Sequence, residues 1–80
     1  MDLIVVIKNR ILQLAREKNF TINGLAEHSG LAPMTLKNII YKNTNNPGIR
    51  TIKILCDGLG ITLAEFFNTK EFDNLEQEIM

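Results

Sequence analysis

The sequence predicts an all-α fold, in one small domain that spans residues 1–80. Apolar side chains recur at spacings of three and four residues through most of the chain, which is the periodicity of amphipathic helices. Gly30 and Gly60 each follow such a segment, at the position where a left-handed glycine commonly ends a helix. With 45% apolar side chains, the chain can form one hydrophobic core, which we place at about residues 4–67.

The first helix is predicted over residues 3–18, where apolar side chains form one stripe. Its members are Leu3, Ile4, Ile7, Ile11, Leu14 and Ala15. The run LIVVI at residues 3–7 would also suit a strand, but no second strand signal exists that could pair with it. A helix with a loosely formed start is therefore the better interpretation.

A helix, a tight turn and a second helix are predicted between Thr21 and Asn43. Thr21 is a suitable N-cap, because its hydroxyl oxygen accepts hydrogen bonds from free amides. The apolar pattern then runs to Gly30, although Gly24 in the first turn costs about 1 kcal/mol relative to alanine. Pro33 suits the first position of the next helix, since its missing N–H has no intrahelical acceptor there.

The helix that begins at Pro33 has an inward and an outward side. Three residues are expected to face the core: Leu36, Ile39 and Ile40. Four are expected to face outward: Met34, Lys37, Asn38 and Tyr41. Ala32 is a poor N-cap, so this helix start is weakly capped, or capped by Thr35 or by a ligand. We interpret the outward side as a probe for the DNA major groove.

Two further helices complete the predicted core. Residues 42–48 have the composition of a loop, and a fourth helix follows that should end at Gly60. Its apolar stripe consists of Ile49, Ile52, Leu55, Cys56 and Leu59. Thr62 and Glu65 form a capping box that opens a short fifth helix. Two phenylalanines at its end are expected in the core: Phe66 and Phe67.

Residues 68–80 form an acidic tail whose structure the sequence leaves open. Its apolar residues, at spacings of three and four, are Phe72, Leu75 and Ile79. They fit a short sixth helix, a frayed end or a dimer contact.

Positive charge is concentrated in the middle third of a chain whose formal net charge is zero. Residues 1–28 hold four basic and three acidic side chains, whereas residues 29–56 hold four basic and none that is acidic. Residues 57–80 hold six acidic side chains and one basic. The basic segment coincides with the predicted third helix and the loop after it, which favours a partner that carries phosphates.

The sequence has no catalytic or metal-binding pattern. Cys56 is the only cysteine, which excludes a disulfide framework or a cysteine-rich zinc site. His28 and Ser29 do not form a catalytic pair, because adjacent helical residues point in different directions. We expect no enzyme activity and no cofactor. LIVVI is too short to span a bilayer and no signal cleavage site follows it, so we expect a cytoplasmic protein without a membrane anchor.

The stretch from Arg10 to Phe67 resembles the Cro/C1-type helix-turn-helix family, also called XRE or phage repressor-like. The matching residues are Leu25-Ala26, Gly30 at the turn, Leu36, Ile39, Pro47 before the fourth helix, Leu59-Gly60-Ile61, Leu63 and Phe66-Phe67. The resemblance implies a compact five-helix lambda-repressor-like domain that reads DNA bases with its third helix. It also implies a homodimer on the operator.

The chain departs from this family at positions that bear on function. Many members pair an arginine with a glutamate across the first and third helices, where this chain has Ala15 and Ile40. Because both charges are absent together, an apolar pair replaces an ion pair, an exchange that is often neutral or stabilising. Ile22 takes the place of a glutamine, and Pro33 and Met34 replace polar residues that often lead the reading helix.

The predicted DNA contacts form two sets. The bases would be read by Met34, Thr35, Lys37, Asn38 and Tyr41. The phosphates would be bound by Thr21, Lys42, Asn43, Thr44, Asn45 and Arg50. Uncapped amides at the starts of the second and fourth helices would help to hold phosphates. Asparagine suits adenine, lysine suits guanine, and Met34 or the Thr35 methyl group suits a thymine methyl group. The apolar start of the helix favours A/T-rich sites.

These patterns favour sequence-specific binding of double-stranded DNA by a transcriptional regulator, a repressor rather than an activator. Useful specificity from so small a domain suggests a homodimer on a palindrome. The zero net charge also suits an alternative function, a protein-interaction module such as an antitoxin or anti-repressor on the same scaffold. Salt-dependent retention on bulk DNA distinguishes the two, because a pure protein binder lacks it.

Overall fold

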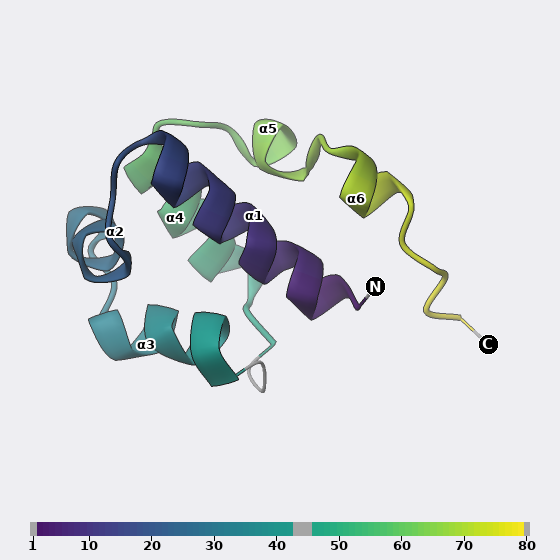
Figure 1. The fold of residues 1–80 in the computed structure, drawn as a ribbon, viewed down its shortest axis with the longest axis horizontal. Helices are drawn as coiled ribbons and strands as arrows, with labels where there is room; N and C mark the ends of the chain where they lie inside the picture. The colour runs from purple at the N-terminus through teal and green to yellow at the C-terminus, as the bar shows by residue number, and fades with distance from the viewer. Residues whose placement is uncertain (1, 43–45, 80) are drawn as a thin grey trace.

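The computed structural model describes residues 2–42 and 46–79, and every regular element in these ranges is helical (Figure 1). In chain order the elements are α1 (Leu3–Glu17), α2 (Ile22–Ser29), α3 (Pro33–Lys37), η1 (Asn38–Lys42), α4 (Ile49–Leu59), α5 (Leu63–Phe67) and α6 (Lys70–Asp73). The element η1 is a π-helix that continues α3 directly. The all-α prediction is confirmed, and the helices pack into a body with extents of 38 × 24 × 20 Å.

Side chains from α1 to α5 meet in one core. Its largest fully buried members are Phe66, Ile11, Leu25, Leu36, Leu55 and Cys56. Three members of the predicted stripes lie outside it: Leu3 is 36% exposed, Ile49 is 62% exposed and Ile4 is half-buried. All three lie in the first turn of a helix. Helical spacing predicts the side that a residue faces, but not how far the neighbouring helices extend along it.

Local hydrogen bonds begin and end the helices where the sequence predicted. The Gly24 amide donates to Thr21 Oγ1 at 2.9 Å. Gly30 and Gly60 follow α2 and α4 with φ angles of 78° and 73°, in the left-handed region. At α5 the Glu65 amide donates to Thr62 Oγ1, and the Thr62 amide donates to the Glu65 carboxylate, both at 3.0 Å. These bonds lower the pKa of Glu65 below its ordinary value.

Helices α2 and α4 cross closely enough to require a glycine. A Cβ atom on Gly58 of α4 would lie 1.9 Å from Ser29 Oγ and 3.2 Å from Ser29 Cα. The Ser29 hydroxyl oxygen is buried there and has no hydrogen-bond partner in the described part of the chain. Helix α2 also contacts α3, so this crossing helps to position α3 on the body.

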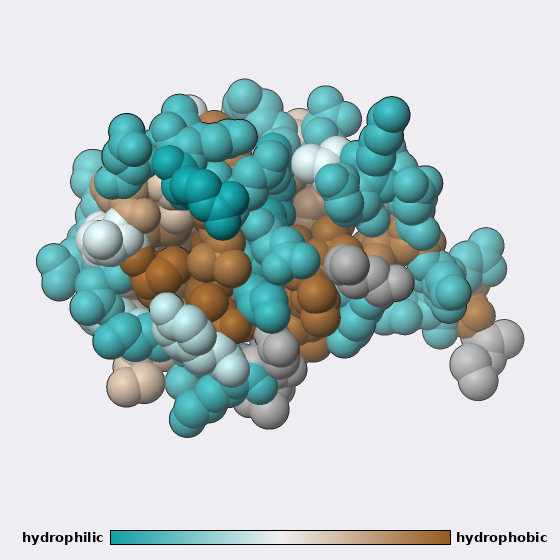
Figure 2. All heavy atoms as spheres, viewed as in Figure 1, coloured by the Kyte–Doolittle hydropathy of each residue, from teal (hydrophilic) through white to brown (hydrophobic). Residues whose placement is uncertain are grey.

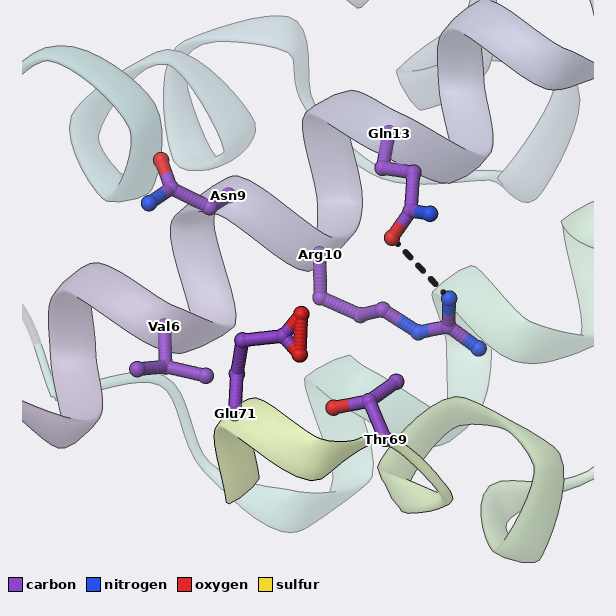
Figure 3. Close-up of a pocket in the computed structure, with 6 residues that line it drawn as sticks. All are labelled: Val6, Asn9, Arg10, Gln13, Thr69 and Glu71. Carbon is purple, nitrogen blue, oxygen red and sulfur yellow. Dashed lines mark hydrogen bonds between the residues drawn. The ribbon is translucent and has the colours of Figure 1, made fainter. Parts of the chain in front are cut away.

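Arg10 of α1 holds the end of α5. Its Nε and Nη2 atoms donate to the carbonyl oxygens of Phe66 and Glu65, both at 2.8 Å, and its Nη1 donates to Gln13 Oε1 at 3.1 Å. Figure 3 shows this guanidinium beside Thr69 and the side chain of Glu71, which points into the same pocket. The pocket encloses about 60 Å³, enough for little more than water.

The acidic tail begins as a short sixth helix. Phe72 of α6 packs against the core, with its ring centroid 4.9 Å from that of Phe67 and 6.1 Å from that of Phe66. Residues 74–79 then continue without regular structure and run away from α3 (Figure 1). Ile79 is 82% exposed on this segment. Of the alternatives that the sequence left open for the tail, the sixth helix is found, and it covers only the four residues Lys70–Asp73.

Within residues 2–42 and 46–79, none of the helices combines the length and the apolar character needed to cross a membrane. In the same ranges no three His, Cys, Asp or Glu side chains are grouped so that they could hold a metal ion. Cys56 is a free thiol in the core, and burial raises its pKa above the ordinary value.

Candidate nucleic-acid interface

A tight turn joins α2 to α3. Gly30 donates its amide to the Glu27 carbonyl at 3.2 Å, and Leu31 donates to the Ala26 carbonyl at 2.8 Å. Pro33 occupies the first position of α3, as predicted. Ala32 precedes it at the N-cap position, and its side chain cannot accept a hydrogen bond from the free amides at the start of α3. The geometry is that of a helix-turn-helix, in which the second helix is carried on the first.

The second helix changes from α to π after Lys37, which the sequence did not predict. A π-helix pairs each amide with the carbonyl five residues earlier, so its turns are wider, and such segments often occur at functional sites. Ile39 and Ile40 are consecutive, and both are buried in the core.

The outward side of α3 and η1 carries most of the predicted base-reading residues. Met34 is 61% exposed and Tyr41 is 68% exposed. We define the α3 surface as these two side chains together with their outward neighbours, namely Met34, Thr35, Lys37, Tyr41 and Lys42. All are exposed except Lys37, which is half-buried. In Figure 2 the rim over α3 is mainly hydrophilic, as a water-facing surface should be.

Asn38 is less available than the other predicted base-reading residues. Its side chain is half-buried, and its Oδ1 atom is wholly buried without a hydrogen-bond partner in the described part of the chain. A bidentate contact with adenine uses both the oxygen and the nitrogen of the amide. In this conformation the oxygen points away from solvent, so the adenine contact requires the side chain to turn.

The predicted phosphate-binding residues are distributed over three helix ends. Lys42 ends η1 and Arg50 lies in the first turn of α4, and both are exposed. Ile49 is exposed beside Arg50, a feature that the stripe analysis missed although its place directly after Gly48 marks a helix start. Thr21 is exposed at the start of α2. Asn43, Thr44 and Asn45 lie outside the described residues.

The two helix starts named as phosphate sites differ. Thr21 Oγ1 accepts a bond from the Gly24 amide, as predicted for an N-cap, so one of the free amides at the start of α2 is already paired. Its hydroxyl hydrogen can still be donated to a phosphate. Gly48 precedes α4 and provides no side-chain cap, so the amides of that first turn are available, as predicted.

The basic side chains of α3, η1 and the start of α4 have no acidic neighbours along this part of the sequence. Over residues 29–56 every charged side chain is basic. Among the described residues the ion pair that meets the usual distance limit joins Lys53 to Asp57 on α4, so Lys53 contributes little net charge. Lys37, Lys42 and Arg50 remain as the cations of the α3 surface and the start of α4.

The apolar pair proposed for α1 and η1 lies in the core. Ala15 is 3% exposed and Ile40 is 4% exposed, and both belong to the main hydrophobic cluster. A carboxylate at either position would be buried without solvent. The scaffold under the α3 surface is therefore held by apolar packing at these two positions.

Comparison with known proteins gives two findings. A family model described as the Cro/C1-type HTH DNA-binding domain matches residues 10–71. The structure is similar to the crystal structure of the prophage Lp1 protein 11, with a TM-score of 0.81 and 26% sequence identity, over 92% of this chain and 97% of that chain. No curated protein matches the chain.

Proposed function

The chain belongs to the Cro/C1-type helix-turn-helix DNA-binding family, and from this premise we propose that it regulates transcription by binding specific sites on double-stranded DNA. The observation that carries the proposal is the α3 surface. It presents exposed side chains and cations on the second helix of the motif, and residues 29–56 contain no acid that would repel phosphates.

Bases are read from α3 and η1 in the major groove. Met34 and Tyr41 are both exposed and can contact thymine methyl groups and base edges. Thr35 and Lys37 add hydrogen-bond donors, and Asn38 contributes after its amide turns toward the groove. The apolar groups at the start of α3, which suit thymine methyl groups, favour A/T-rich half-sites.

Phosphates are bound on either side of the groove. Lys42 and Arg50 supply charge, Thr21 supplies a hydroxyl, and the amides at the start of α4 point toward an incoming anion. Asn43, Thr44 and Asn45 are proposed for the same role from their sequence position. Each phosphate that is neutralised steepens the slope of log affinity against log salt by about 0.9.

Two copies act on one operator. One domain of this size contacts only a few base pairs, so we propose that two copies pair on the operator as a homodimer, with their reading helices in successive major grooves about 34 Å apart. Binding at such a site blocks access to the DNA by bulk alone, which makes a repressor the simplest regulator.

Selection of duplexes from a random pool by the purified protein tests this function. We expect a palindrome with A/T-rich half-sites about one helical turn apart. A paired substitution, Lys42→Gln with Arg50→Gln, should then reduce affinity for the selected duplex and flatten its salt dependence. The matched control is Lys18→Gln with Lys70→Gln, which removes the same charge from two exposed positions, the C-cap of α1 and the first residue of α6. Equal losses in both variants would refute the assignment of the phosphate-binding residues.

A protein-interaction module is the second candidate. Tyr41 and Ile49 are exposed apolar side chains, and the net charge of zero avoids general attraction to nucleic acid. An antitoxin or anti-repressor would use such a surface for a protein partner. Elution of the protein from bulk DNA at the same low salt as a neutral control protein would favour this candidate over DNA binding.

A further inference from the structure

Residues 74–79 form an arm that is both acidic and apolar. Glu76 and Glu78 are exposed on it, and Ile79 is the most exposed large apolar side chain among the described residues. Figure 2 shows the arm as mainly hydrophilic with a hydrophobic residue next to its grey end. A cleft of about 320 Å³ separates the arm from the start of α1 and is lined by Asp2, Leu3, Leu75, Glu76, Gln77 and Glu78.

This arm is complementary to the opposite part of the molecule. The α3 surface offers Met34 and Tyr41 as exposed apolar groups, with Lys42 beside Tyr41 in sequence. Arg50 and Ile49 repeat the combination at the start of α4. The cations and apolar groups of the α3 surface and of the start of α4 therefore match the acids and the apolar group of the arm.

We propose that the arm of one copy docks on the α3 surface of a second copy, so that self-association competes with DNA binding. This inference rests on the proposed function, because the arm and DNA can compete only if DNA also binds the α3 surface. The second copy is the occupant because the arm runs away from α3 of its own chain (Figure 1). Glu76 and Glu78 take the place of phosphates against Lys42 and Arg50, while Ile79 covers apolar surface beside Tyr41.

Such a contact is weak and depends on salt. Its ion pairs form between exposed side chains, where each pair contributes little and salt weakens the attraction; at physiological ionic strength charges more than about 8 Å apart are largely screened. A duplex presents a continuous row of phosphates and releases counterions when it binds, so it displaces the arm. Free protein is associated at high concentration, and the DNA-bound form has its arms released.

Sedimentation velocity of the whole chain at low and high salt tests the docking. We expect the average mass to exceed that of one copy at low salt and to fall to it at high salt. The variant Glu76→Gln, Glu78→Gln, Ile79→Ser should remain a single copy at both. The matched control is Glu17→Gln with Glu27→Gln, which removes two exposed acids from α1 and α2 and should associate like the parent.

A labelled random-sequence duplex tests the competition. Adding it should dissociate the associated parent, and the arm variant should bind it about twofold more tightly or better at concentrations where half of the parent is occluded. A parent that is a single copy at low salt, or whose association survives in the arm variant, would overturn the docking. Association that the duplex leaves intact would overturn the competition. If neither the parent nor the arm variant bound the duplex, the proposed function would fail. The masses from sedimentation velocity would still test the contact between the arm and the α3 surface.

Discussion

Replacing Gly58 with alanine should destabilise the domain, although alanine is ordinarily the better helix former. The added Cβ would lie 1.9 Å from Ser29 Oγ, 2.9 Å from Ser29 Cβ and 3.2 Å from Ser29 Cα. Rotation of the serine side chain moves only its hydroxyl. The two nearest carbons are fixed to the backbone of α2, so α2 and α4 must move apart.

The magnitude follows from two opposing terms. Alanine gains about 1 kcal/mol of helix propensity over glycine. Overpacking of a tight contact costs about 1–3 kcal/mol, and a clash with backbone belongs at the upper end of that range. We therefore expect a net loss of about 1–2 kcal/mol in the free energy of unfolding. In a domain of this length each kcal/mol lowers the melting temperature by about 4–8 °C.

Urea unfolding followed by circular dichroism measures this loss. Ser29→Gly in the same chain removes the hydroxyl and Cβ and leaves only the 3.2 Å approach to Cα, so it should recover part of the stability of Gly58→Ala. The double-mutant cycle then gives a favourable coupling between the two positions. A Gly58→Ala protein more stable than the parent, or a coupling of zero, would refute the close packing of α2 on α4.

Lys37→Ala or Asn38→Ala should each weaken binding to the selected duplex by about 1–3 kcal/mol in a fluorescence titration without lowering the melting temperature; parental affinity in both would mean that another surface reads the bases. Ile40→Glu places an unpaired carboxylate in the core and should cost about 3 kcal/mol or more in thermal unfolding, and Ala15→Arg should recover part of it, whereas an unchanged melting temperature would contradict the paired exchange. Because the pKa of Glu65 is lowered in the folded state, its bonds with the Thr62 N-cap stabilise above the unfolded pKa and are lost as the pH falls through the folded one. The stability difference between the parent and Glu65→Gln should therefore be largest above about pH 5 and shrink in acid, and a difference independent of pH would show that the charge is not involved.

Features decided by neighbours in the chain could be predicted from the sequence. Gly30 and Gly60 end helices because the left-handed conformation costs glycine little. Thr62 and Glu65 satisfy each other's amides over three residues, and Pro33 suits the first turn of a helix for its own steric reasons. The family match over residues 10–71 confirms the resemblance, to which Gly30 and Gly60 contributed.

Features decided by residues distant in the chain could not be predicted from the sequence. Arg10 bonds to carbonyls of α5 that lie 55 and 56 residues away, and no spacing rule connects them. The close approach of Gly58 to Ser29 depends on how two helices cross. Leu3 and Ile49 carried the correct periodicity but lie at helix starts beyond the core.

The candidate interface shows the same division. The outward direction of Met34 and Tyr41 follows from helical spacing, and both are exposed. The π-helix at residues 38–42, in which the consecutive Ile39 and Ile40 are both buried, was not predicted by that spacing. The buried oxygen of Asn38 depends on a side-chain rotation that a sequence pattern does not encode.

The central claim is that the α3 surface and the start of α4 face DNA. Chemical-shift mapping of the ¹⁵N-labelled protein during titration with the selected duplex tests it most directly. We predict that the largest shifts fall on residues 33–42 and 48–51 and on Thr21, with little change along the first two turns of α1. Shifts confined to α1 and α5, with residues 33–42 unchanged, would contradict it.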